Sequence, residues 1–168
     1  HERLVGSEMC IETGFIEKPT EKVQLTAVRN ASHNIHFITS PSERVQLTVI
    51  GTRPSYVGFI PNPTEKVQLK AVEKRPECIF LLQKPTEKVQ LTAVLKDPRY
   101  LSAIREPTEK VQLAAVQKNP KCIRHIAEPT EKVQHMAVQR SPDIFRQIRQ
   151  PEDCLLYTSP SPRDAHES

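Results

Sequence analysis

The sequence predicts an all-α protein, an α-solenoid of short helix-turn-helix repeats, from three observations. Proline recurs every 22 residues, and the block after it closely follows the pattern P-[TS]-E-[KR]-V-Q-L-x-A-V. In most units a second proline follows in the same register. The seven repeat-opening prolines are Pro19, Pro41, Pro63, Pro85, Pro107, Pro129 and Pro151. A strict period of this length is typical of a solenoid built from stacked units.

The proline register divides the chain into units, whose positions we number 1 to 22 from the opening proline. Residues 1–18 read as the end of a partial N-terminal repeat, and residues 151–153 as the start of an interrupted one. The six full units span residues 19–40, 41–62, 63–84, 85–106, 107–128 and 129–150.

The last residues, 154–168, are expected not to be native. The segment 154–164 reads CLLYTSPSPRD, which back-translates to the adapter used in transposase-based sequencing libraries. The alternative is a native Pro/Ser-rich tail. Because the chain also begins at His1 without a methionine, we interpret it as a gene fragment from environmental DNA, cut at both ends.

The first helix of each unit is predicted to begin after position 2 and to run through about position 12. Position 2 is Thr or Ser in every unit, and these hydroxyl side chains are favoured as helix N-caps. The Glu at position 3 suits the positive end of the helix dipole.

A second helix of about two turns is predicted from position 14, where proline ends the first helix and suits the start of another. Asp97, Asn119 and Ser141 precede this proline as candidate caps. Apolar residues at positions 17 and 20 share one face, which assigns Phe145 and Ile148 to the core of the last unit. Helices this short are marginal alone, so they are expected to pack on each other and on the next unit.

Asp-Pro and Asn-Pro dipeptides stand between helices, at Asp97-Pro98 and Asn119-Pro120, and a V-x-L-x-A-V block lies at 111–116. In these two features the chain resembles short-period α-helical solenoids of the leucine-rich-repeat-variant and HEAT-like groups. The chain is also similar to tandem repeats of unknown function in phage and bacterial proteins. The resemblance covers about residues 19–150 and implies a right-handed superhelix with binding surfaces. Since no capping repeat is visible, end-to-end self-association is expected.

A glutamine stands at the centre of the apolar face of every first helix. An unsatisfied buried amide costs about 1–3 kcal/mol. We therefore interpret the row as a structural ladder, bonded to loop carbonyls and N–H groups or to the glutamine of the next unit. The alternative is a row of amides lining a ligand groove. Its members are Gln24, Gln46, Gln68, Gln90, Gln112 and Gln134.

Basic residues recur on the exposed side of the first helix and form a candidate partner-binding stripe. The position-4 members are Lys22, Arg44, Lys66, Lys88, Lys110 and Lys132, and the position-12 members are Lys74, Lys96, Lys118 and Arg140. A basic stripe along a solenoid can follow a phosphate backbone. The competing interpretation is a mixed Glu/Lys surface that serves solubility, because each position-4 base adjoins a Glu.

Function is predicted to be non-catalytic, as a scaffold that binds a protein through surface positions that vary between units. These are positions 8, 11 and 12 of the first helix and 15, 18, 19 and 21 of the second. Nucleic-acid binding along the stripe is the alternative, although the absence of Trp and an aromatic content of 5% leave few stacking platforms. A third alternative is a non-catalytic part of a larger enzyme.

Neither a catalytic residue nor a cofactor or metal site is predicted. His33 and His36 have a spacing that can hold a metal, but no carboxylate or cysteine accompanies them, so they are interpreted as solvated. Packing is the expected role of His125 and His135. Some HEAT-like solenoids are DNA-repair glycosylases with an aromatic and carboxylate cleft, and nothing in the sequence supplies that cleft.

The compartment is predicted to be the cytoplasm, and no membrane association is expected. No apolar run approaches the roughly 18 residues of a membrane span. Cys78 and Cys122 hold equivalent positions two units apart, which is too far for a disulfide, so they are expected to be reduced packing residues. Net charge is only +4.

Overall fold

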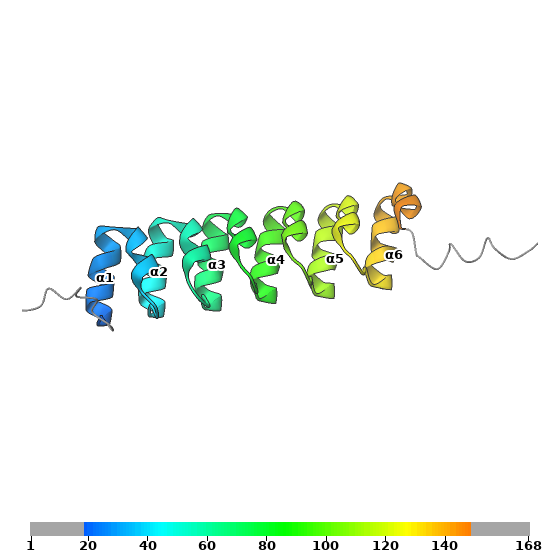
Figure 1. Cartoon of the computed structure of the whole chain (residues 1–168). Helices are drawn as coiled ribbons and strands as arrows, with labels where there is room; N and C mark the ends of the chain where they lie inside the picture. The colour runs from blue at the N-terminus through cyan, green and yellow to red at the C-terminus, as the bar shows by residue number, and fades with distance from the viewer. Residues whose placement is uncertain (1–18, 149–168) are drawn as a thin grey trace, which may run out of the picture.

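The computed structural model describes residues 19–148, and over this range the chain is all-helical with no strand. Six α-helices stand side by side in a single row, and each is followed by a 3₁₀ helix (Figure 1). The solenoid of 22-residue helix-turn-helix units is therefore confirmed. Its right-handed superhelix stays a prediction.

The α-helices begin at the Glu of position 3 and end at position 12 in every unit, as the N-cap and second-proline signals predict. They are α1 (Glu21–Asn30), α2 (Glu43–Thr52), α3 (Glu65–Lys74), α4 (Glu87–Lys96), α5 (Glu109–Lys118) and α6 (Glu131–Arg140). The N-cap residue is Thr or Ser throughout. The Ser42 and Thr64 hydroxyls accept from the backbone N–H three residues on, at 3.4 Å. In the other four units no side-chain cap bond forms.

The second helix of each unit is a 3₁₀ helix rather than an α-helix. These are η1 (Ser32–Phe37), η2 (Pro54–Phe59), η3 (Pro76–Leu81), η4 (Pro98–Ala103), η5 (Pro120–His125) and η6 (Pro142–Gln147). In the first five units the N–H of position 20 bonds to the carbonyl of position 17, for example Ile104 to Leu101 at 3.0 Å. Because a 3₁₀ helix has three residues per turn, positions 17 and 20 lie on one face.

The core lies between the α-helices and the 3₁₀ helices. Each 3₁₀ helix from η1 to η5 contacts both its own α-helix and the following one, so every unit covers its neighbour. Valine at position 5 is fully buried from α2 onward, and position 17 of η1 to η5 supplies one buried aliphatic residue per unit. Burial of this continuous apolar stripe is what holds helices that would be marginal alone.

The last unit departs from the predicted core pattern. Phe145, which the position-17 rule assigns to the core, is 71% exposed, while Ile144 is buried. The final turn of η6 closes with a four-residue bond, from the N–H of Ile148 to the carbonyl of Ile144 at 3.1 Å. This wider turn rotates Phe145 outward and places Ile144 against the core, so the assignment of Phe145 is wrong.

The cap and cysteine predictions of the second helices hold in part. Asp97 and Asn119 accept from the backbone N–H two residues on, at 2.9 and 3.1 Å, whereas Ser141 makes no such bond. Cys78 and Cys122 are buried free thiols, as predicted, and burial raises the pKa of both. The predictions for residues 1–18 and 149–168 lie outside the described residues.

Candidate partner-binding surface

The glutamine ladder lies at the start of each α-helix and bonds within its own unit. The Nε2 atom of each glutamine donates to the carbonyl of the proline that opens the unit, at 2.9 to 3.0 Å. The Oε1 atoms of Gln24, Gln46, Gln68, Gln90 and Gln112 are buried without a donor among the described residues. The amide therefore ties the extended linker to the first helical turn, and no glutamine bonds to another in residues 19–148.

The position-4 row of the basic stripe pairs with glutamates of the preceding unit. Nitrogen–oxygen distances are 3.9 Å for Arg44–Glu21, 3.4 Å for Lys66–Glu43, 3.5 Å for Lys110–Glu87 and 3.3 Å for Lys132–Glu109. These pairs are solvent-exposed, so each contributes little stability. They matter more for the charge of the surface, because the glutamates offset the positive charge of the bases along the row.

The position-12 row has a different role that the sequence pattern did not indicate. The Lys74 ammonium donates to the carbonyl of Gly51, Lys96 to those of Val72 and Glu73, and Lys118 to that of Leu95. Each lysine thus reaches the C-terminal turn of the preceding α-helix. Carbonyls at this end have no intrahelical partner and carry the negative end of the dipole, which favours a cation.

The opposite face carries a surface whose aromatic character sequence reasoning did not single out. Every Phe and Tyr side chain within residues 19–148 lies on a 3₁₀ helix. We call the surface formed by η1–η6 and the extended linkers between successive units the groove face. Its exposed large apolar residues are Phe37, Phe59, Phe80, Leu81 and Phe145. Four of them occupy positions 18 and 19, which the sequence predicts to face a partner, and Phe145 occupies position 17, which it assigns to the core.

The aromatic rings of the groove face contact one another across units. His36 of η1 packs on Phe59 of η2 with ring centroids 4.3 Å apart, and within η2 Tyr56 meets Phe59 edge-on at 5.6 Å. Phe80 of η3 meets Tyr100 of η4 in the same way at 5.9 Å. Such pairs are worth about 0.5–1.5 kcal/mol each, so these contacts favour the observed arrangement of the paired rings.

Two adjacent pockets lie along the 3₁₀ helices and linkers of four consecutive units, and we call them together the groove. Its first part, about 950 Å³, is lined by residues of η1, η2, η3 and the linkers that follow them. Its second part, about 750 Å³, is lined by the ends of η3 and η4 and by their linkers. The two parts share Leu81, Leu82, Gln83 and Lys84. Gln68 lines the first part and Gln90 the second, so two glutamines of the ladder also contribute to the groove wall.

Two backbone features shape the first part of the groove. Gly58 lets η2 and η3 approach closely, because a Cβ there would meet the Cβ of Leu81 at 3.3 Å. Asn62, between two prolines of the linker, has a φ of 51°, a left-handed conformation that asparagine tolerates better than most residues.

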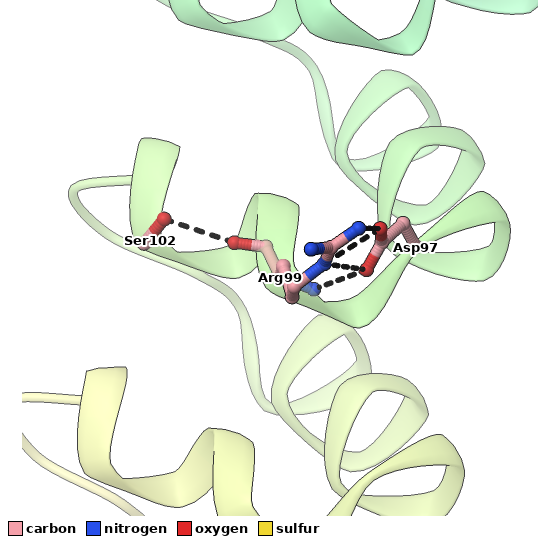
Figure 2. A network of polar contacts seen from close by, with 3 residues as sticks. All are labelled: Asp97, Arg99 and Ser102. Carbon is pink, nitrogen blue, oxygen red and sulfur yellow. Dashed lines mark hydrogen bonds and ion pairs between the residues drawn. The ribbon is translucent and has the colours of Figure 1, made fainter.

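The polar network on η4 is a local cap rather than a reactive site (Figure 2). Asp97 accepts from the backbone N–H of Arg99 and forms an ion pair with its guanidinium at 2.7 Å, while the Ser102 hydroxyl donates to the Arg99 carbonyl. The hydrogen bonds from the Arg99 side chain, with the backbone bond, hold the pKa of Asp97 below its ordinary value.

The histidines of the described range belong to no group of side chains that could bind a metal. Residues 19–148 hold no group of three or more His, Cys, Asp or Glu side chains placed to bind a metal, and none of their helices has the length and apolar character to cross a membrane. His33 and His36 are exposed. The packing role predicted for His125 and His135 is wrong, because both side chains face solvent.

Comparisons with protein families, with curated proteins and with solved structures give no match to this chain. The architecture alone defines its class, a helical repeat protein.

Proposed function

We propose that the chain is a non-catalytic scaffold that binds a partner protein on the groove face. The observation that carries this proposal is the concentration of exposed apolar side chains there. Phe37, Phe59, Phe80 and Leu81 are between 45% and 77% exposed and line the two adjacent pockets of the groove. Contiguous exposed apolar surface of this kind marks interaction sites, and aromatic residues are enriched in the cores of interfaces.

Nucleic-acid binding along the α-helix face is the weaker candidate. Four of its position-4 bases already lie within 4.0 Å of a glutamate, and three position-12 lysines donate to helix carbonyls. A phosphate backbone would have to displace these partners.

The proposal also includes a repeat group and a cellular compartment. We place the repeat with the HEAT-like and leucine-rich-repeat-variant group, on the strength of its regular pairs of short helices. We place the scaffold in the cytoplasm, supported by the two buried free thiols Cys78 and Cys122.

A random peptide library displayed on phage, selected on the purified chain, tests the proposal. We expect the enriched peptides to lose at least about tenfold in affinity on a Phe37→Ser/Phe59→Ser variant. They should keep their affinity on Leu95→Ser, which removes a comparably exposed apolar residue from α4 on the other face. Equal binding to all three proteins would contradict a binding role for the groove face.

A further inference from the structure

The groove on this face has a composition that selects among protein partners. One nearly buried aliphatic residue recurs at its floor in each unit, namely Ile38, Ile60, Leu82 and Ile104, and polar residues such as Thr39, Asn62 and Gln83 line it as well. Because the two parts of the groove follow successive units and share one linker, an occupant that fills both lies along the solenoid axis. An elongated chain with regularly spaced apolar side chains matches this floor.

The charges at the groove are unbalanced. The first part is lined by Lys84 and by no carboxylate. The second part adds Arg105, with Glu106 as its single acidic lining residue. Neither Lys84 nor Arg105 has a carboxylate within 4.0 Å in the described part of the chain. On the α-helix face, by contrast, bases and glutamates alternate at contact distance.

We propose that the groove binds an extended peptide segment of the partner in which apolar side chains alternate with carboxylates. The apolar side chains of the peptide pack on the aliphatic residues of the floor, beside the exposed phenylalanines. Its carboxylates pair with Lys84 and Arg105. Complementary charge of this kind sets partner choice more than raw affinity. The inference rests on the proposed function, since it names the partner of that same face.

A single-stranded nucleic acid fits the groove less well. Surface for stacking a base is scarce, because His36 and Phe59 already contact each other, which leaves Phe37 as the exposed ring of the first part without an aromatic partner among the described residues. Two cations over four units also fall far short of one per phosphate, whereas binding of nucleic acid depends on many phosphate contacts.

Three synthetic peptide pools provide the test. All alternate Leu or Phe with one polar residue, which is Glu in the first pool, Gln in the second and Lys in the third. Binding of labelled pools to the full chain is measured by fluorescence anisotropy at low and high salt, with single-stranded oligo(dT) as a fourth probe. We expect the Glu pool to bind at least about tenfold more tightly than the Gln pool, and this preference to shrink as salt screens exposed charge.

The variant Lys84→Glu/Arg105→Glu should abolish this preference or reverse it toward the Lys pool. The control Lys88→Glu/Arg140→Glu makes the same charge change at exposed residues of α4 and α6, and it should leave the preference intact. Circular dichroism confirms that both variants remain helical.

The outcomes separate this inference from the proposed function. Equal binding of the Glu and Gln pools, lost on Phe37→Ser/Phe59→Ser, would overturn the charge selection and leave the groove face as a protein-binding site. Failure of every pool would overturn the inference, and the library selection would then decide the proposed function by itself. Tighter binding of oligo(dT) than of any peptide, abolished by Lys84→Glu/Arg105→Glu, would assign the groove to nucleic acid.

Discussion

The glutamine ladder permits a test of which way its amide points, through the substitution Gln90→Glu in α4. The Nε2 atom of Gln90 donates to the Pro85 carbonyl at 3.0 Å, and the side chain is only 7% exposed. A carboxylate at this place faces the carbonyl with no proton to donate and carries a charge that is largely cut off from water. The protonated carboxyl group, however, restores a donor to the same carbonyl.

The magnitude follows from the pKa of the introduced group. Burial and a hydrogen bond made only by the neutral form both raise the pKa of a carboxyl, and raising a pKa by one corresponds to about 1.36 kcal/mol. The position is in the first turns of α4, where the dipole favours a negative charge by about 0.3–1 kcal/mol and offsets part of the loss. With an ordinary glutamate pKa of about 4.3, we expect a loss of about 2–4 kcal/mol at neutral pH.

The sign of the pH dependence is fixed by the raised pKa. A carboxyl whose folded pKa lies above its unfolded value stabilises the fold least when it is ionised. The difference in unfolding free energy between wild type and variant should therefore vanish below about pH 4.3 and grow as the pH rises through the folded pKa.

Urea unfolding followed by far-UV circular dichroism, at several pH values, measures this difference. Gln117→Glu makes the same chemical change at an exposed position of α5 and should cost no more than about 0.5 kcal/mol. Wild-type stability of Gln90→Glu at neutral pH would mean that a donor, and not the Pro85 carbonyl, faces the side chain. A loss that does not change with pH would refute the proton argument.

Three further predictions concern packing, capping and the thiols. Ile79→Ala should cost about 2–5 kcal/mol in urea unfolding, because Ile79 is fully buried, whereas Phe37→Ala at an exposed site should cost less than about 1 kcal/mol; equal losses would contradict the core assignment. Asp97→Ala should destabilise the chain at neutral pH but not in acid. The pKa of Asp97 is lower in the folded than in the unfolded chain, so its contribution to stability is present above the unfolded pKa and disappears as the pH falls through the folded pKa. An effect that does not depend on pH would exclude the ion pair. In a Cys10→Ser/Cys154→Ser background, Cys78 and Cys122 should react with a thiol reagent at a rate set by unfolding, and rapid reaction in the folded protein would contradict their burial.

Much of the fold follows from local sequence. The proline register sets the period, the Thr or Ser of position 2 marks where each α-helix begins, and the second proline marks where a new helix begins. The aliphatic residues at positions 5, 7, 9 and 10 predict the apolar stripe, although the leucines at position 7 of α2 to α5 are only partly buried. These signals act over a few residues and repeat in every unit, so a single chain shows them several times.

The candidate site was less accessible to sequence reasoning. The variable positions 18 and 19 were expected to face a partner, but the groove between them depends on how far apart successive 3₁₀ helices stand. Gly58 and Leu81 set that approach for η2 and η3, although they belong to different units. The basic stripe can be predicted from the pattern of a single unit. That pattern does not show that the glutamates and carbonyls bound by these bases lie in the preceding unit.

Sequence by itself determined the class of the protein, a helical repeat, because backbone propensity, capping and apolar spacing are properties of neighbouring residues. The tertiary structure decided how units meet. It chose Ile144 over Phe145 for the last core position, directed Lys96 and Lys118 to the carbonyls of the preceding helix, and gathered the aromatic residues around one groove. The lysine contacts and the aromatic contacts between units join residues about one repeat apart, and their geometry depends on the stacking distance and rotation of whole units, which no single unit encodes.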